Sequence, residues 1–99
     1  VKDGTEIYLD ANALDLSSKL VLRRWREGDR IAPFGMKGTK KISDIFSDAK
    51  LSLAQKNDMW ILEHNGSILW VVGLRASRHF AINDATTHIL CIKNLQSGY

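Results

Sequence analysis

Two glycines, three lysines and two large apolar residues fall within the nine positions 33–41, PFGMKGTKK. Lysine side chains attract anions, and glycine lets a backbone approach a ligand closely because it carries no Cβ. Phe34 and Met36 are expected to anchor this loop to the core. A phosphate-binding loop has this composition, and so does a solvated basic loop with two apolar anchors, which stays open as the alternative.

The start of the next predicted helix favours the phosphate interpretation. Thr39 is expected to cap that helix, because its hydroxyl can accept a hydrogen bond from an unpaired backbone N–H. Lys40 and Lys41 then fall in the first turn, where the helix dipole disfavours each cation by about 0.3–1 kcal/mol. A bound phosphate would remove this conflict, because the free N–H groups and both ammonium groups attract it.

Basic residues are concentrated in one fifth of the chain. The whole sequence has a net charge of +3, but residues 23–41 contain seven arginines and lysines against two acidic residues, a local charge of +5, so the remainder carries −2. This asymmetry favours a polyanionic partner. Arg24 and Arg26 are expected on one side of a strand, with Trp25 on the other side and packed in the core.

The elements that must position these residues can be read from hydrophobic periodicity. The helical spacing of Ile42, Ile45, Phe46 and Ala49 predicts a helix over Thr39–Lys50. Alternating or apolar runs predict strands. The further expected elements are strands over 5–10, 20–25, 79–83 and 86–95, a turn at 27–29 and a short helix over 52–58.

The clearest element is a hairpin. Asn65-Gly66 lies between the apolar runs Trp60–His64 and Ser67–Val72 and is typical of a type I′ turn, in which both central residues have positive φ. Such a turn would place Leu62 opposite Leu69, Ile61 opposite Trp70 and Trp60 opposite Val71, with both tryptophans buried. Because both faces are apolar, the two strands are expected at the centre of a sheet.

These elements predict an α+β fold that is rich in β-structure, with a small mixed sheet or β-sandwich-like core and one or two short helices. The 99 residues suffice for a single domain, 1–99. No signal peptide and no apolar run long enough to cross a bilayer are visible, and Cys91, the single cysteine, is expected to be buried. These features suit a cytoplasmic protein with no membrane contact.

The sequence contains no motif that indicates a complete active site. There is no GxxxxGK[ST] nucleotide-binding loop and no Ser-Gly-Gly-x-Asp-Ser loop of the pyrophosphatase type. The three histidines lack metal-ligand spacing, and the acidic residues form no obvious acid–base pair. We therefore expect no catalytic residue, no metal site and no cofactor in this chain.

Several motifs together resemble one known family. Leu22–Arg30 (LRRWREGDR), Pro33–Ile42 (PFGMKGTKKI) and Phe46–Lys50, followed by Trp70–Arg75 (WVVGLR) and Phe80, are similar in order and spacing to the C-terminal domain of tRNA(Ile)-lysidine synthetase. The resemblance covers residues 20–92. It implies a fold similar to a domain of the phenylalanyl-tRNA synthetase β subunit.

The resemblance also implies a function. The parent enzyme is an ATP-dependent ligase that joins L-lysine to the wobble cytidine of tRNA(Ile) with the anticodon CAU. ATP with Mg and L-lysine would be bound by its N-terminal catalytic domain, a second partner of this chain, and the resemblance leaves open a homodimer of the parent. The C-terminal domain would be non-catalytic and would grip the acceptor stem of the tRNA.

Carried over to this sequence, the resemblance assigns structural roles to the glycines and Pro33 and contact roles to basic residues. Ser52, Asp58 and Trp60 depart from the family pattern, which puts residues 52–60 in doubt as an RNA contact. The candidate tRNA-binding residues are Arg24, Arg26, Arg30, Lys37, Thr39, Lys40, Lys41, Arg75 and Arg78.

Two alternatives remain from the residues alone. In a protein-interaction or dimerisation module, the same basic face would contact only water. A generic nucleic-acid binder would use this face to bind nucleic acid without preference for tRNA. Salt dependence separates an RNA-binding domain from the first alternative. Competition between tRNA and duplex DNA separates it from the second.

Overall fold

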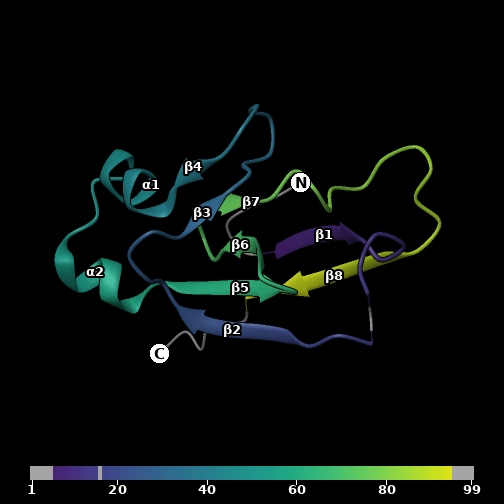
Figure 1. Cartoon of the computed structure of the whole chain (residues 1–99), viewed down its shortest axis with the longest axis horizontal. Coiled ribbons are helices and arrows are strands. Elements are labelled where there is room, and N and C mark those ends of the chain that lie inside the picture. Colours follow the sequence, from purple (N-terminus) through teal and green to yellow (C-terminus); the bar gives the residue numbers. More distant parts are fainter. Residues whose placement is uncertain (1–5, 16, 95–99) are drawn as a thin grey trace.

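The computed structural model describes residues 6–15 and 17–94 (Figure 1). These residues form an α+β fold rich in β-structure, as the sequence predicts. Its elements in chain order are β1 (Glu6–Asp10), β2 (Leu20–Arg24), β3 (Arg30–Ile31), β4 (Lys40–Lys41), α1 (Ile42–Asp48), α2 (Leu53–Asp58), β5 (Trp60–His64), β6 (Ser67–Val71), β7 (Arg75–Ala76) and β8 (Ile89–Lys93).

The central layer is an antiparallel sheet with the strand order β2-β5-β6-β7. Its two middle strands are those of the predicted hairpin. Two smaller antiparallel pairs, β1–β8 and β3–β4, complete the sheet structure. In Figure 1 both helices lie at one end of the molecule, while β1 and β8 lie side by side toward the other end.

The two faces of the central sheet are covered by different elements. On one face, Leu62 and Trp70 pack with Ile7 and Leu9 of β1. On the other face, Ile61 packs with residues of α1 and β3. Successive residues of a strand point to opposite faces, so the apolar run of β5 supplies both clusters. Trp25 packs against the α1 cluster, as expected, with its ring at 89° to that of Phe46.

The turn of the hairpin is confirmed, but the predicted register is wrong beyond it. Asn65 and Gly66 both have positive φ (49° and 79°). A bulge at Leu69 then shifts the ladder, so that Leu62 pairs with Trp70 and not with Leu69. Because of the extra residue, Leu69 and Trp70 both face the side of the sheet that β1 and β8 cover. A two-residue loop fixes the register only as far as the first bulge.

The predicted helix over 39–50 begins too early. The observed helix spans Ile42–Asp48, because Lys40 and Lys41 pair with β3 in a short ladder and the Ile42 N–H continues that ladder to the carbonyl of Asp29 at 3.0 Å. The predicted helix over 52–58 is confirmed, and Ser52 caps it with a full capping box.

Four other predicted strands differ from the structure at their ends or altogether, and the one over 20–25 ends one residue early, at Arg24. Residues 79–83 form no strand, and only Ala81 makes a bridge, to Leu9. The predicted strand over 5–10 is present as β1, although Thr5 lies outside the described residues. The strand predicted over 86–95 is present only in part, as β8, because residues 86–88 and 94 form no strand and Leu95 lies outside the described residues. The turn at 27–29 is confirmed, with Gly28 at φ 93°.

Four side chains expected in the core are exposed. Phe34 is 51% exposed and Met36 42%, because their loop stands out from the sheet instead of folding over it. Trp60 is 40% exposed, in contrast to Trp70 at 2%, because β1–β8 does not cover its end of β5. Cys91 is exposed because alternate residues of β8 face outward.

Candidate nucleic-acid interface

The β3–β4 ribbon separates the predicted contact residues onto two faces. Arg30 lies directly opposite Lys41, and Ile31 opposite Lys40. Residues opposite each other in an antiparallel pair share a face. Ile31 is buried, so Lys40 lies on the inner side, while Arg30 and Lys41 are both exposed on the outer side.

Thr39 belongs to the outer face of the ribbon. Its hydroxyl accepts a hydrogen bond from Arg30 Nε at 2.9 Å, and its carbonyl accepts a longer one of 3.4 Å from the same guanidinium. This contact holds the Arg30 side chain along the ribbon surface. Arg30, Thr39 and Lys41 together make up this outer surface, the ribbon face.

The helix-start arrangement predicted for the lysines is wrong. The N-cap of α1 is Lys41, which makes no side-chain capping bond, and Thr39 lies two residues before it. Lys40 is not free for an anion either, since its ammonium forms an ion pair with Asp48 at the far end of α1. An anion site here must therefore rest on the ribbon face and not on the helix dipole.

The loop over 33–39 is held in a fixed shape by its backbone. A turn closes with Met36 N donating to Pro33 O at 3.2 Å, and Gly35 takes the positive φ of 85° that the third position of a type II turn requires. The Phe34 N–H donates to the carbonyl of Ala76 at 2.9 Å, which fastens the loop to β7.

Arg78 is a structural support of this loop. Its guanidinium donates to the carbonyl of Met36 at 2.9 Å and also to that of Gly38. Its own backbone N–H donates to Ala32 O at 2.8 Å. The sequence predicts Arg78 as an extension of the basic patch, and the structure brings it to the loop as expected, but with its donors used by the loop carbonyls.

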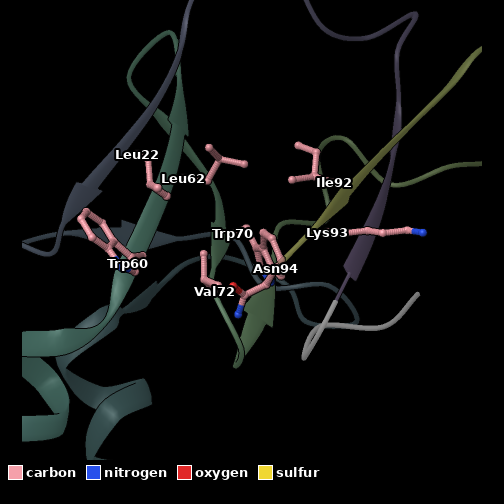
Figure 2. Close-up of a pocket in the computed structure, with 8 residues that line it drawn as sticks. All are labelled: Leu22, Trp60, Leu62, Trp70, Val72, Ile92, Lys93 and Asn94. Carbon is pink, nitrogen blue, oxygen red and sulfur yellow. The ribbon is translucent and has the colours of Figure 1, made fainter. Parts of the chain in front are cut away.

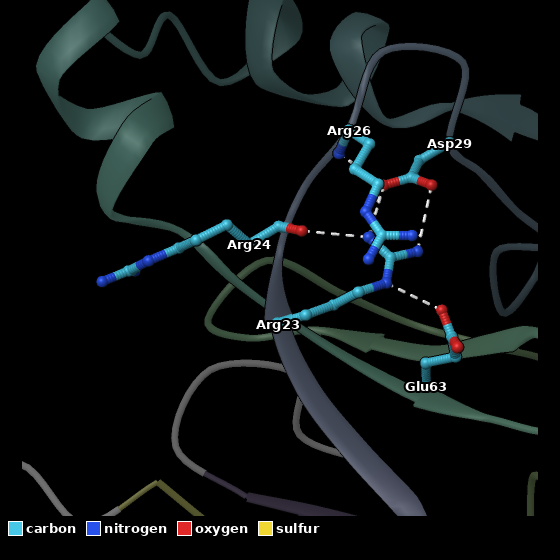
Figure 3. A network of polar contacts seen from close by, with 5 residues as sticks. All are labelled: Arg23, Arg24, Arg26, Asp29 and Glu63. Carbon is cyan, nitrogen blue, oxygen red and sulfur yellow. Dashed lines mark hydrogen bonds and ion pairs between the residues drawn. The ribbon is translucent and has the colours of Figure 1, made fainter.

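A partly buried ion-pair network fixes the end of β2 and the turn that follows it (Figure 3). Arg23 donates to both carboxylate oxygens of Asp29, at 2.9 and 3.0 Å, and to Glu63 at 2.7 Å. Asp29 also accepts the backbone N–H of Arg26 at 2.7 Å. Because Arg23 and Asp29 are each largely buried and fully paired, this network positions the neighbouring arginines and adds no free charge to the surface.

The network shifts both ionisation equilibria. Hydrogen bonding to Asp29, opposed by burial, raises the pKa of the Arg23 guanidinium above its ordinary value. Burial alone would raise the pKa of Asp29, but the hydrogen bonds from Arg23 and from the Arg26 N–H lower it below its ordinary value. Asp29 is therefore held as a carboxylate.

Arg24 is paired with an aromatic ring that the sequence did not reveal as a partner. Its guanidinium lies 3.6 Å from the centroid of the Trp60 ring and donates to the carbonyl of Asp58 at 2.6 Å. The sequence predicts Trp60 in the core, and only the pairing of β2 with β5 brings it to Arg24. Arg26 has no hydrogen bond or ion pair from its side chain among the described residues.

The same end of the sheet borders an apolar groove of about 260 Å³ (Figure 2). Leu22 and Trp60 lie on one side of it and Ile92 and Lys93 of β8 on the other. With one charged lining residue, Lys93, this groove has little to offer a phosphate. It shows instead where β1–β8 leaves the central sheet uncovered.

The nine candidates thus differ in their freedom to meet a ligand. Arg24, Arg30, Lys40 and Arg78 donate to groups of the chain itself, but Nη1 of Arg30 makes no hydrogen bond with the described residues and stays available to a ligand. Within residues 6–15 and 17–94, the basic side chains of the candidate set without a hydrogen-bond or ion-pair partner are those of Arg26, Lys37, Lys41 and Arg75. Arg75 lies apart, half-buried beside Ala49 at the end of α1.

The structure also bears on metal binding and on membrane crossing. In the part of the chain that the structure describes, no group of three or more acidic, histidine or cysteine side chains could hold a metal ion. Neither described helix is long and apolar enough to cross a membrane.

Comparison with known proteins gives matches over most of the chain. The family model of the TilS substrate C-terminal domain matches residues 20–92. The tRNA(Ile)-lysidine synthase of Parabacteroides distasonis is 47% identical over 88 residues, which are 89% of this chain and 20% of that protein. That of Bacteroides thetaiotaomicron is 38% identical over 78 residues, 79% of this chain and 18% of that protein.

A solved structure agrees with the sequence matches. The crystal structure of a TilS C-terminal domain superposes with a TM-score of 0.78 at 32% identity, over 97% of this chain and 75% of that chain. The chain spans about a fifth of the length of these two lysidine synthases. From the family match and the fold together, the chain belongs to the TilS substrate C-terminal domain family.

Proposed function

We propose that this chain, residues 1–99, is a single tRNA-binding domain, the C-terminal domain of a tRNA(Ile)-lysidine synthase, and that it grips the acceptor stem of tRNA(Ile) with the anticodon CAU. Membership of the TilS C-terminal domain family supports the first part. The names of the relatives, tRNA(Ile)-lysidine synthase, support tRNA(Ile) as the RNA.

One observation carries the RNA-binding role: Arg30 and Lys41 are exposed cross-strand neighbours. Like charges directly opposite each other destabilise a β-ladder. Neither side chain forms an ion pair with a described carboxylate, so no described acidic group offsets the repulsion between the two cations. A phosphate between them would, and A-form RNA offers rows of phosphates while hiding most base edges in its deep major groove.

The remaining parts of the proposal concern the full-length enzyme. ATP with Mg and L-lysine would be bound by an N-terminal catalytic domain, with which this domain would act in the cytoplasm. In that arrangement the chain contributes binding energy and orientation of the tRNA, and phosphate contacts would set its position on the RNA without reading sequence. Homodimerisation of the full-length enzyme stays an open expectation.

The test is binding of tRNA(Ile) to the chain at several salt concentrations, in competition with duplex DNA of equal length. Each neutralised phosphate contributes roughly 0.7–0.9 to the slope of log K against log salt. We expect a steep salt dependence and a clear preference for tRNA. Binding that does not depend on salt would contradict an RNA-binding role, and equal affinity for DNA would leave a generic nucleic-acid binder.

A protein-interaction module remains a second candidate because of one observation. β2 is an edge strand of the central sheet, and its side chains Leu20, Val21 and Leu22 are all exposed. An apolar edge strand is a template for pairing with the same edge of a second copy. Sedimentation of wild type and of Val21→Lys over a range of concentrations tests this pairing of two copies. Dimers of the wild type that the lysine abolishes would support it. A wild type that stays monomeric at every concentration would exclude it.

A further inference from the structure

Phe34 and Met36 form an exposed apolar tip on the basic loop that follows β3. They are 51% and 42% exposed. Lys37 follows them with no partner among the described residues, and the ribbon face begins at Thr39. Neither apolar residue contributes to the two described core clusters. Their exposure therefore serves no packing that the described residues show.

The exposure is not the result of a loose loop. The backbone of Phe34 is bonded to Ala76, and that of Met36 to Pro33. Arg78 holds the carbonyls of Met36 and Gly38 from below. The tip is thus presented in a fixed backbone conformation, and a preorganised loop loses little entropy when a ligand binds it.

We propose that this tip stacks on the face of an unpaired nucleobase, next to the phosphates that Lys37 and the ribbon face hold. This inference rests on the proposed RNA-binding function. Phosphate and ribose are polar, so the apolar surface that RNA can offer to Phe34 is the face of a base. In a duplex those faces are stacked on one another, whereas a base in a single-stranded segment exposes them.

The positive charge around the tip favours RNA over a protein as the occupant. A protein surface that covered Phe34 and Met36 would also have to neutralise or exclude Lys37 and Lys41, which have no partner among the described residues. RNA supplies the base face and the neighbouring phosphates in one ligand. The expected ligand is therefore a duplex with an adjoining single-stranded segment.

The test uses two RNA hairpins with the same stem, each closed by a non-nucleotide linker so that no loop base is unpaired, one blunt and one with a short single-stranded 3′ tail. Both are titrated against the chain at several salt concentrations. We expect Phe34→Ala to weaken binding of the tailed hairpin roughly 5- to 150-fold, the range for losing one base–aromatic stack. Blunt-hairpin binding and both salt slopes should not change. Phe34→Trp should restore tailed-hairpin binding.

Leu53→Ala is the matched control, since Leu53 is an apolar residue 73% exposed on α2. It should leave both affinities unchanged. Equal loss on the two hairpins, no loss on either, or a change in sedimentation mass with Phe34→Ala would overturn the stacking proposal while the RNA-binding function stands. Absence of salt-dependent binding of either hairpin by wild type would instead remove the RNA-binding function and this proposal with it. Thermal melts check that each variant folds.

Discussion

The guanidinium of Arg24 lies over the ring of Trp60, 3.6 Å from its centroid, where the two residues face each other across the β2–β5 ladder. The pair joins a residue expected to bind RNA with one expected in the core. It also fixes the Arg24 side chain against the protein, because the guanidinium donates to the carbonyl of Asp58 as well.

Truncation of the two tryptophans should therefore have unequal effects on stability. Trp70→Ala should lower the free energy of unfolding by roughly 3–5 kcal/mol, because it empties a buried site. Trp60→Ala should cost clearly less. A double-mutant cycle of Arg24→Gln and Trp60→Leu should give a coupling of about 0.5–1 kcal/mol, the range for an exposed cation–π pair. Urea unfolding measures all of these, and equal costs for the two tryptophans would contradict the structure.

The ion pair of Arg23 with Asp29 should make stability depend on pH. The folded-state pKa of Asp29 is lowered, so the carboxylate contributes stability that is fully present above its unfolded pKa of about 3.9 and is lost as pH falls through the folded pKa. Asp29→Asn should cost roughly 1.5–3 kcal/mol at neutral pH, the range for hydrogen bonds to a charged group.

Unfolding of wild type and Asp29→Asn between pH 7 and about pH 2 checks this, in the window around and below the unfolded pKa. The two stabilities should converge toward the acid end. Asp44→Asn, at an exposed position in the first turn of α1, is the matched control and should change little. A gap between wild type and Asp29→Asn that stays constant with pH would show that the contribution is not the carboxylate charge.

Arg78 should act on the loop and not as a free phosphate contact. Arg78→Ala removes the donor to the carbonyls of Met36 and Gly38, so hydrogen exchange at the Met36 amide should become faster. Arg75→Ala, which removes an arginine without a described partner, should leave that exchange unchanged. If both variants exchange alike and Arg78→Ala flattens the salt slope of RNA binding by about 0.7–0.9, Arg78 is an RNA contact after all.

The sequence alone predicts the elements that local patterning specifies. The type I′ turn at Asn65-Gly66 and the apolar stripe of α1 depend on neighbours close in the chain. The turn is present, and so is the stripe except for Ala49, which is exposed beyond the end of the helix. The predicted start of α1 is wrong because Lys40 and Lys41 pair with β3, nine to eleven residues upstream along the chain. The residues that mark a helix start in a sequence carry no information on whether a distant strand pairs with the same segment.

The sequence predicts which residue types make up the candidate site better than it predicts how their side chains are arranged. The cluster of basic residues is evident in the sequence, but which of them are free depends on long-range partners. The ammonium of Lys40 is paired with Asp48, and the guanidinium of Arg78 donates to the loop carbonyls. The guanidinium of Arg24 lies over the ring of Trp60. The exposed state of Phe34 could not be predicted either, because apolar residues in a loop are as suited to anchoring it as to meeting a ligand.

The central claim is that the ribbon face holds phosphates through Arg30 and Lys41. Changing both residues to glutamine should flatten the slope of log K against log salt by roughly 1.4–1.8 units, about 0.7–0.9 for each phosphate that is no longer neutralised. Folding should survive and gain slightly in stability, because the variant removes a pair of like charges that face each other across a ladder.

The decisive measurement is the binding of tRNA(Ile) at several salt concentrations to wild type, to Arg30→Gln/Lys41→Gln and to Lys40→Gln. Lys40 is the matched control, since it neighbours Lys41 in sequence but lies on the inner side of the ribbon in an ion pair with Asp48. The account predicts a flattened slope for the double variant and an unchanged slope for Lys40→Gln. An unchanged slope for the double variant, or an equal change for Lys40→Gln, would contradict it.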